Sequence, residues 1–302
     1  MNKERLQEYN EILSENNISL EDINNTINEL PDVGNMMEKF EINDASYLFY
    51  KGARINALNE ILKLCKDLTN MSQMFYQCQT LKEINLSNFD TSKVTDMSYM
   101  FYSCSILENV DLSNFSVENV TNLGYAFNNC QKLKSLDLSS FNTPKNTRLS
   151  FMFGYCSQLE NLNISNFDTS EVTYMDGTFY NCQKLKSLDL SNFDFCKTNY
   201  ISTFITNCTV LENLEFGVNL GKAYTQKRAN YNQYTLSFNG TQNLTHDSLM
   251  DVINKLYDLN LTYDVANGGT LYTQQLILGA DNLAKMTSEE LNIVVQKGWV
   301  VS

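Results

Sequence analysis

The stretch that decides the fold is residues 95–120, which read TDMSYMFYSCSILENVDLSNFSVENV. Its cysteine belongs to a column that advances by 26 residues at each step: Cys78, Cys104, Cys130, Cys156, Cys182 and Cys208. Phenylalanines keep the same step three residues before the cysteines, at Phe75, Phe101, Phe127, Phe153 and Phe179. A fixed period of this length indicates an array of identical supersecondary units, each of which buries its apolar face against its neighbours.

Within one period, the spacing of apolar side chains predicts a short helix followed by a strand. Met97, Met100, Phe101 and Cys104 fall at i, i+3, i+4 and i+7, the stripe of an amphipathic helix. The column just before it contains residues that favour helix N-caps, namely Thr69, Thr95, Thr121, Thr147, Thr173 and Asn199. After the cysteine, apolar and polar residues alternate over residues 109–113, which is typical of a half-buried strand.

Stacking such units predicts an α/β solenoid over residues 45–217. Its parallel strands would line the concave face and its short helices the convex face, with strands ~4.8 Å apart. The period degenerates at both ends, since Gly52 stands in the cysteine column and Ile205 in the phenylalanine column. We therefore expect six full units and one degenerate leading unit.

Composition and charge restrict the partners. The formal net charge is −13 and no lysine or arginine cluster occurs, which argues against nucleic acid and anionic membranes as partners. No apolar run approaches the ~20 residues of a membrane span, so no membrane insertion is expected. Residues 1–17 also lack the apolar core of a secretory signal.

The N-terminal segment, residues 1–31, is predicted to be helical and is followed by a linker at 32–44. Apolar residues recur there at seven-residue steps, at Leu6, Leu13, Leu20 and Ile27. One interpretation is a coiled coil that makes a dimer or trimer or attaches the chain to a particle. The alternative is two short helices, broken at Asn16-Asn17.

The C-terminal segment, residues 218–302, is predicted to be a small α/β domain that covers the last repeat. Thr245 is placed to cap a helix that runs through Tyr257, and residues 271–278 alternate like a strand. Thr287 and Glu290 form a capping-box pattern for a second helix, which ends at Lys297-Gly298.

Catalysis, cofactors and metals find little support in the sequence. His246 is the single histidine and falls at a helix start, and no phosphate-binding glycine loop or HExxH motif occurs. The cysteine column lies on the apolar stripe, which predicts buried free thiols, although disulfides between neighbouring units are the alternative. Zinc is disfavoured because the column contains no CxxC pairs. We expect a protein that is not an enzyme and has no cofactor.

Two sets of side chains are candidates for ligand binding. The first is the polar column on the predicted concave face, which could bind cations or sugar hydroxyls: Asn85, Asp111, Asp137, Asn163, Asp189 and Glu215. The second is a set of outward-facing aromatic residues: Tyr76, Tyr99, Tyr102, Tyr125, Phe151 and Tyr180. Aromatic patches of this kind form recognition surfaces. The alternatives are a solvated sheet face without a ligand and rings that merely cover the seam between helix and strand.

The pattern Cys-x-x-Leu-x-x-Leu-Asp-Leu-Ser-Asn-Phe-Asp-Thr-Ser-x-Val-Thr-x-Met, as in residues 78–97 and 156–175, closely resembles BspA-like leucine-rich repeats. More narrowly, it resembles the subtype found in surface proteins of Mollicutes and Gram-positive bacteria. The resemblance implies a leucine-rich-repeat solenoid and a binding role at a bacterial surface. The closing segment LILGADNLAKMT and the opening segment are similar to phage tail or baseplate proteins.

Together these features predict a non-enzymatic recognition protein that binds a cell-surface protein or glycan. The first hypothesis is a receptor-binding, tail-tip or tail-fibre component of a phage or phage-tail-like particle, located in the virion. The alternative is a secreted or surface-attached adhesin of the BspA type, which binds host matrix or mucin.

Overall fold

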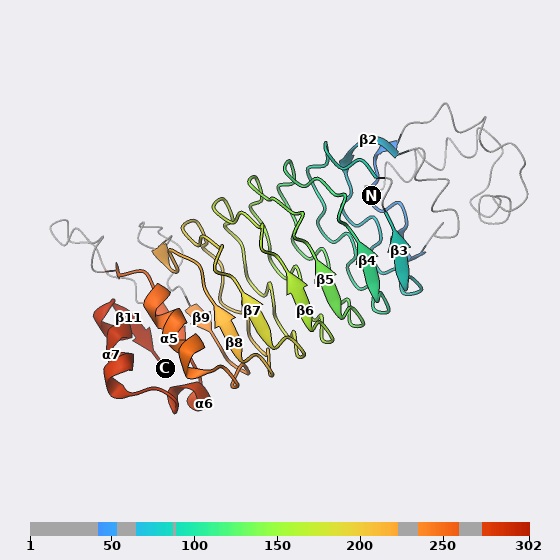
Figure 1. Ribbon diagram of the computed structural model, residues 1–302. Helices are drawn as coiled ribbons and strands as arrows, with labels where there is room; N and C mark the ends of the chain where they lie inside the picture. The colour runs from blue at the N-terminus through green and yellow to red at the C-terminus, as the bar shows by residue number, and fades with distance from the viewer. Residues whose placement is uncertain (1–41, 53–64, 87–88, 223–234, 260–273) are drawn as a thin grey trace, which may run out of the picture.

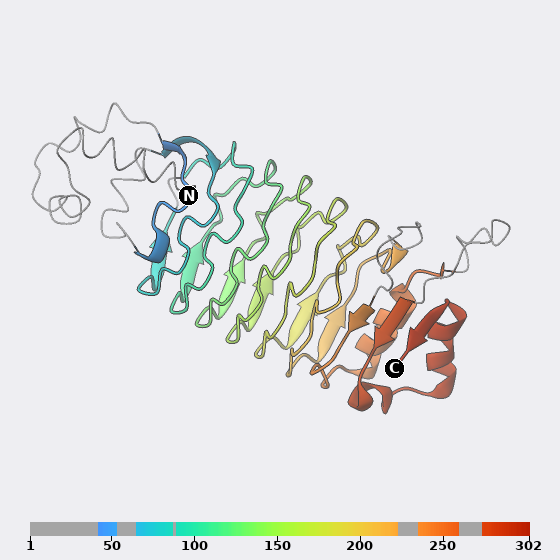
Figure 2. The ribbon, with the colours of Figure 1, turned by 180° about the vertical axis from the view of Figure 1, so that it is seen from behind.

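The computed structural model describes residues 42–52, 65–86, 89–222, 235–259 and 274–302. Within these ranges the repeats form successive coils of one elongated stack, with a mixed α/β unit at its C-terminal end (Figure 1 and Figure 2). The coiled coil or helix pair predicted for residues 1–31 lies outside the described residues.

Each coil contributes one short strand to the same side of the stack (Figure 1). These strands are β3 (Glu83–Asn85), β4 (Asn109–Asp111), β5 (Ser135–Asp137), β6 (Asn161–Asn163), β7 (Ser187–Asp189) and β8 (Asn213–Glu215). The leading coil holds β1 (Ile42–Asp44) and η1 (Tyr50–Gly52), and β1 pairs in parallel with β2 (Cys65–Asn70). The stack therefore already includes the end of the segment 32–44 for which a linker is expected.

The predicted strands are confirmed, but they do not form one continuous sheet. They pair two by two and in parallel, β3 with β4, β5 with β6 and β7 with β8. The sequence alternates in step with this pairing, since the residue before each strand reads Lys82, Glu108, Lys134, Glu160, Lys186 and Glu212. In each pair the glutamate N–H donates to the lysine carbonyl, at 2.8 to 2.9 Å. The strand pairing thus has a period of two coils.

The predicted helices are wrong. Residues 65–86 and 89–222 contain no α-helix, and residues 97–104 form two consecutive four-residue turns. The third residue of each turn, Tyr99 and Ser103, has φ of 56°. Buried positions at i, i+3, i+4 and i+7 fit two such turns as well as they fit two helical turns, so the apolar pattern cannot separate them.

Backbone hydrogen bonds explain why the turns are stable without a helix. The N–H groups of Met97, Tyr99, Phe101 and Ser103 donate to carbonyls of the next coil, at 2.7 to 3.1 Å. Those of residues 100, 102 and 104 donate to carbonyls three residues earlier, and the Ser98 N–H donates to Asp96 Oδ1. Every backbone donor in the segment is satisfied, as burial requires.

The threonine column does not cap helices either. Thr121 donates both its N–H and its hydroxyl to the carbonyl of Thr95, at 2.8 and 3.1 Å. Next to this column a parallel ladder of single bridges runs up the whole stack, through Asn70, Asp96, Asn122, Arg148, Tyr174 and Tyr200. Coil-to-coil hydrogen bonds therefore replace the helical ones on this side.

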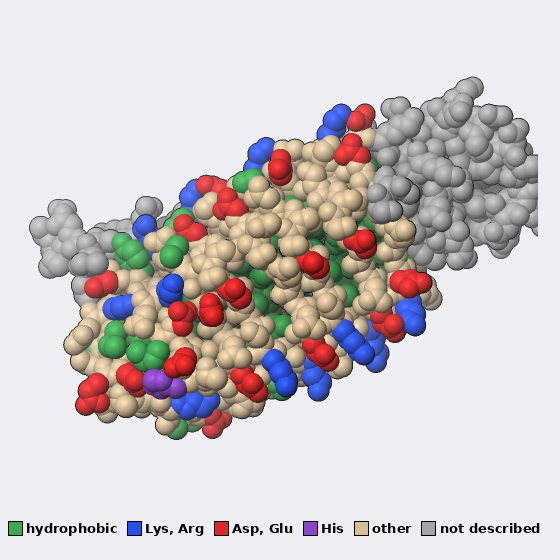
Figure 3. Space-filling view, viewed as in Figure 1, with side chains coloured by type: hydrophobic (Ala, Val, Ile, Leu, Met, Phe, Trp, Pro, Cys, Tyr) green, Lys and Arg blue, Asp and Glu red, His purple; other side chains and the backbone are tan. Residues whose placement is uncertain are grey.

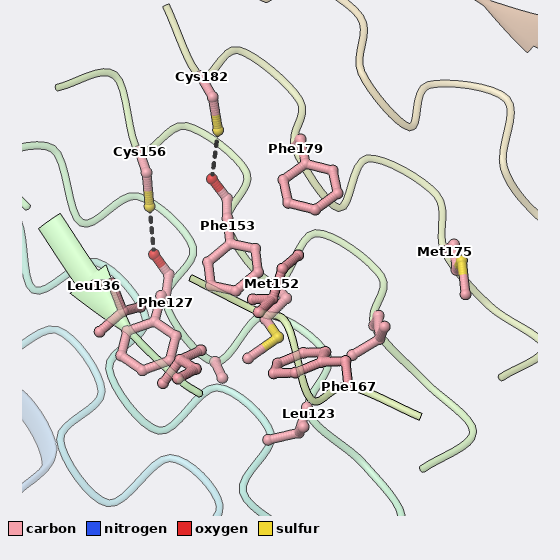
Figure 4. Close-up of a cluster of buried hydrophobic side chains, with 14 of the residues drawn as sticks. Leu123, Phe127, Leu136, Met152, Phe153, Cys156, Phe167, Met175, Phe179 and Cys182 are labelled. Atoms are coloured by element: carbon pink, nitrogen blue, oxygen red, sulfur yellow. Dashed lines mark hydrogen bonds between the residues drawn. The ribbon is translucent and has the colours of Figure 1, made fainter. Parts of the chain in front are cut away.

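The core consists of continuous columns of identical side chains. The rings of Phe75, Phe101, Phe127, Phe153 and Phe179 are buried and stacked, with centroids 5.2 to 6.0 Å apart. The six column cysteines are buried free thiols, which agrees with the prediction of a reduced ladder. Figure 4 shows two of these thiols, Cys156 and Cys182, directed at carbonyls of the phenylalanine column.

The C-terminal unit is built from β9 (Thr235–Ser237), α5 (His246–Lys255), β10 (Gln274–Ile277), α6 (Ala280–Leu283), α7 (Ser288–Gln296) and β11 (Trp299–Val301). Its strands form a parallel sheet in the order β11-β10-β9. The predicted helix start at Thr245 is confirmed by its hydroxyl, which accepts from the Ser248 N–H. The predicted capping box at Thr287 and Glu290 is also confirmed.

This unit completes the hydrogen bonds of the last coil. The N–H of Leu214 in β8 donates to Ser248 Oγ at 2.9 Å, and that of Phe216 donates to Asp251 Oδ2 at 2.7 Å. Lys297 in turn places its ammonium on the carbonyls of residues 253, 254 and 256 at the end of α5. A cation at a helix C-terminus satisfies the last carbonyls of that helix.

Candidate functional site

The six predicted strand-side residues lie in a row at the ends of β3 to β8, and all six are exposed. Register brings them together in pairs, Asn85 beside Asp111, Asp137 beside Asn163, and Asp189 beside Glu215. In Figure 3, acidic and basic side chains lie along the lower edge of the stack, below these strands. The predicted row is present, and we call these six residues the strand-side row. Its aspartates bind groups of their own turns.

The carboxylates of this row shape the turn that follows each strand. Asp111 Oδ1 accepts the N–H of Ser113 at 3.0 Å, and Asp137 Oδ1 accepts that of Ser139 at 2.9 Å. These backbone N–H groups, together with the serine hydroxyls, lower the pKa of both carboxyls. Such Asx turns explain why short acidic or amide side chains recur at this position without any ligand.

The six predicted aromatic residues converge on the side formed by the four-residue turns. This turn face comprises residues 71–78, 97–104, 123–130, 149–156, 175–182 and 201–208. Ring contacts extend the predicted set to nine members: Tyr47, Tyr50, Tyr76, Tyr99, Tyr102, Tyr125, Phe151, Tyr155 and Tyr180. We call this set the aromatic cluster. Its rings are half-buried, apart from Tyr155, which is 43% exposed.

Two rows of parallel rings form the centre of the aromatic cluster. In the first row, Tyr76 stacks on Tyr50 and on Tyr102, with centroids 5.2 and 4.7 Å apart. In the second, Tyr125 stacks on Tyr99 and on Phe151, at 4.6 and 5.3 Å. These distances match the ~4.8 Å spacing between hydrogen-bonded strands, so successive coils present their rings in register.

Tyr47, Tyr50 and Tyr155 are members that sequence reasoning missed. Tyr50 lies one period before Tyr76, and Tyr47 one period before Gln73, so extending the columns into the leading coil would have found both. Tyr155 belongs to the column of Ser103 and Asn129, which contains no other aromatic residue, so the column does not predict an aromatic side chain there.

Five rings of the aromatic cluster are attached to residues in the left-handed region. Tyr47, Tyr99, Tyr125, Phe151 and Tyr155 have φ between 51° and 63°. This region costs a residue with a Cβ about 1–2 kcal/mol, and the cost is lowest for Gly and Asn. Equivalent positions of other coils hold Gly177, Asn129 and Asn181, and also Gln73, Gln77 and Ser103, all at positive φ. The fold thus accepts Gly or Asn, which have a lower conformational free energy in this region, at positions where the aromatic cluster has aromatic residues.

Charge is nearly absent from the turn face. Among its described residues, Asp176 is the one acidic or basic side chain, and the others are aromatic, apolar, hydroxyl, amide, thiol or glycine. Asp176 accepts the N–H and the hydroxyl of Ser202, and burial raises the pKa of its carboxyl. Burial also raises the pKa of Tyr99 and Tyr125. At neutral pH Tyr99 and Tyr125 therefore present protonated hydroxyls.

The remaining candidates for chemistry have structural partners. His246 Nε2 lies 2.9 Å from Glu290 Oε1, which joins the first turns of α5 and α7. The described residues hold no cluster of three or more histidine, cysteine or acidic side chains suited to a metal ion. Over the same ranges, no helix has the length and apolar character needed to cross a membrane.

Comparison with known proteins finds a family for the repeats. The sequence model of one family, described as "Mycoplasma protein of unknown function, DUF285", matches residues 43–160 and 123–248, which together cover more than half of the chain. BspA-like repeat proteins are part of this family. No curated protein matches the chain in sequence. The chain belongs to the DUF285 family of repeat proteins.

Proposed function

We propose that this chain is a non-enzymatic recognition protein that binds a component of a cell surface through the aromatic cluster. The observation that carries the proposal is the placement of five of its rings on left-handed residues, at positions where Asn or Gly serve the fold at lower cost. Strain of this kind persists where a side chain is needed for function. Large, rigid tyrosine side chains also supply much contact area with few rotors.

The strand-side row is the weaker candidate for the binding surface. Its carboxylates are engaged in the turns that follow the strands, as in the pairs Asp111 with Ser113 and Asp137 with Ser139. The rings of the aromatic cluster also stack between coils, but this leaves each of them at least partly exposed to a partner. We therefore assign recognition to the turn face.

Binding measurements on paired variants test this assignment. Fluorescently labelled protein is titrated onto fixed wall-less bacteria, Gram-positive bacteria and epithelial cells, and bound protein is counted by flow cytometry. The double variant Tyr99→Asn/Tyr125→Asn is expected to lose at least tenfold in affinity, because Asn fits the left-handed backbone and removes only the rings. The control Asp111→Asn/Asp137→Asn should bind like the parent. The reverse result would move recognition to the strand side, and no binding to any cell type would contradict the proposed function.

Two biological contexts fit a recognition protein of this kind, a phage-like particle and a bacterial adhesin. The ends of the chain resemble phage tail or baseplate proteins, which supports a receptor-binding component of a phage or phage-tail-like particle. The resemblance of the repeats to BspA-like proteins, which are part of the matched family, supports the second, a secreted or surface-attached adhesin of the BspA type. Immunogold labelling separates them, since label on purified particles supports the first and label on the bacterial envelope supports the second.

A further inference from the structure

We infer that the partner of the aromatic cluster is a protein surface, contacted by ring edges and hydroxyl groups, and not a glycan. This inference rests on the proposed function and specifies its ligand class. It depends on how the rings are stacked, on what covers one end of each row, and on the chemistry of the side chains around them.

Within the two rows, the ring faces that a sugar needs are turned toward neighbouring rings. Sugars bind aromatic side chains by laying their C–H groups on the face of the ring, where the π electrons are. In the row Tyr50, Tyr76 and Tyr102 the planes of neighbouring rings differ by 10°, and between Tyr99 and Tyr125 they differ by 2°. Parallel rings at these centroid distances cover each other's faces, so the rows offer edges and hydroxyls to a partner.

Protein groups also cover one end of each row. The ammonium group of Lys51 lies 5.3 Å from the centroid of the Tyr50 ring, over its face. At the far end of the second row, Phe151 lies against Gly177, where an added Cβ would come within 2.3 Å of the ring. The glycine thus leaves the space that this ring fills. No ring face at these two ends is open to a sugar.

The exposed chemistry fits a protein partner. Ring edges carry partial positive charge and tyrosine hydroxyls donate hydrogen bonds, so both favour carbonyl and other oxygen acceptors. Around the rings lie short polar side chains, such as Ser103, Asn129 and Asn181. Tyrosine combined with serine, glycine and asparagine is the composition of antibody paratopes, which bind protein surfaces. The cluster reaches from the leading coil to the coil of Tyr180, about 24 Å at ~4.8 Å per coil, a suitable length for the centre of a protein interface.

The rings are held in position before any partner arrives. The Tyr99 N–H donates to the carbonyl of Gly124 at 3.0 Å, and the Tyr125 N–H donates to that of Ser150 at 2.8 Å. These bonds and the stacking fix the rows, which lowers the entropy lost on binding. The turn face carries one carboxylate and no lysine or arginine, and Lys51 at the leading end of the aromatic cluster is the one cation placed over its described rings. We therefore expect binding to depend only weakly on salt.

Selective destruction of target molecules on cells tests the inference. Cells that bind the labelled parent protein are divided into three portions, which are treated with proteinase K, with sodium metaperiodate to oxidise glycans, or with buffer. Protease is expected to reduce binding at least tenfold, whereas periodate should change it less than twofold. Affinity for untreated cells should change less than threefold between 50 and 500 mM NaCl.

The controls make each outcome decisive. Tyr99→Asn/Tyr125→Asn should give background binding on all three portions, and Asp111→Asn/Asp137→Asn should follow the parent. Loss of binding after periodate with retention after protease would overturn the protein assignment while leaving a recognition function intact. Equal binding by the parent and the tyrosine variant would instead contradict the proposed function itself. A steep loss of affinity with salt would show that charged groups outside the turn face carry recognition.

Discussion

The thiol of Cys156 donates a hydrogen bond of 3.1 Å to the carbonyl oxygen of Phe127, 29 residues earlier (Figure 4). The same bond recurs in each coil from Cys78 to Cys208, at 2.9 to 3.2 Å. The Phe127 carbonyl also accepts the Cys130 N–H of its own turn. The cysteine column therefore links successive coils, in addition to filling the core.

Replacement of this cysteine should destabilise the stack moderately. Cys156→Ala removes the thiol donor and leaves a small space in a fully buried column, so a loss of about 1–2 kcal/mol is expected. Cys196→Ala is the control, because Cys196 lies outside the column and is half-buried, and it should cost less. Urea denaturation measures both, and equal losses would contradict a linking role for the column.

The same column should make the protein sensitive to alkali. Burial raises the pKa of Cys156 to about 12 and that of Cys208 to about 12, above the value near 9 of an exposed thiol. A group whose pKa is raised by folding contributes stability that is complete below its unfolded pKa and is lost as the pH rises through its folded pKa. Melting temperatures should therefore fall between pH 9 and 12. The double variant Cys156→Ala/Cys208→Ala should show a shallower fall, and an unchanged slope would refute this origin.

Removing a strained ring should leave stability nearly unchanged. Tyr155→Asn relieves a bulky residue at φ 63° but loses an edge contact with Tyr180, whose centroid lies 5.1 Å away. Because both effects are about 1 kcal/mol, the net change should stay within about 1 kcal/mol. Calorimetry checks this. Phe153→Ala, in the buried column, is the contrast and should cost about 3–5 kcal/mol. A comparable loss for Tyr155→Asn would mean that the ring is structural.

The acidic residue of the turn face should destabilise the fold at neutral pH. Burial raises the pKa of the Asp176 carboxyl, so its stabilising contribution is complete below the unfolded pKa of ~3.9 and is lost as the pH rises through the folded value. Asp176→Asn keeps an oxygen acceptor for Ser202 and removes the charge. We expect it to raise stability at pH 7 by about 1 kcal/mol or less and to have a smaller effect at pH 4. Equal shifts at the two pH values would argue against a charge effect.

The contact between α5 and β8 should be essential for the end of the stack. Ser248→Ala removes the acceptor of the Leu214 N–H and leaves a buried donor unsatisfied, which should cost about 1–3 kcal/mol. Asp247→Asn is the neighbouring control, because the side chain of Asp247 is fully exposed, and it should change stability by less than ~0.5 kcal/mol. Hydrogen exchange of Leu214 should accelerate only in the first variant.

Sequence periodicity was sufficient to predict the stack and its core columns, because a repeated unit multiplies every local signal. The helix starts of the C-terminal unit were predicted from the capping residues Thr245 and Thr287 instead. Periodicity failed for the turns, since positions such as Met97, Phe101 and Cys104 serve helical and four-residue turns equally well. What excludes the helix is the set of bonds from one coil to the next, for example from Tyr99 N–H to Gly124 O. Such partners are distant in sequence, so no pattern within one unit reveals them.

For the candidate site residues, too, the sequence predicts which residues are neighbours but not what their side chains contact. Their columns predicted correctly that Tyr99 and Tyr125 are neighbours, and likewise Asp137 and Asn163. The columns do not reveal that Asp137 is engaged with the Ser139 N–H, or that the tyrosine rings cover each other's faces. Those facts depend on backbone angles and ring planes.

The pairing of strands two by two leads to a prediction of how such genes change length. Residues 129–139 and 181–191 are identical, NCQKLKSLDLS, and begin 52 residues apart, which is one pair of coils. Unequal crossing-over between two such tracts would add or delete one whole pair of coils. Every remaining strand that follows a lysine would then still pair with a strand that follows a glutamate. Natural length variants should therefore differ by multiples of 52 residues, and a gain or loss of 26 should be rare.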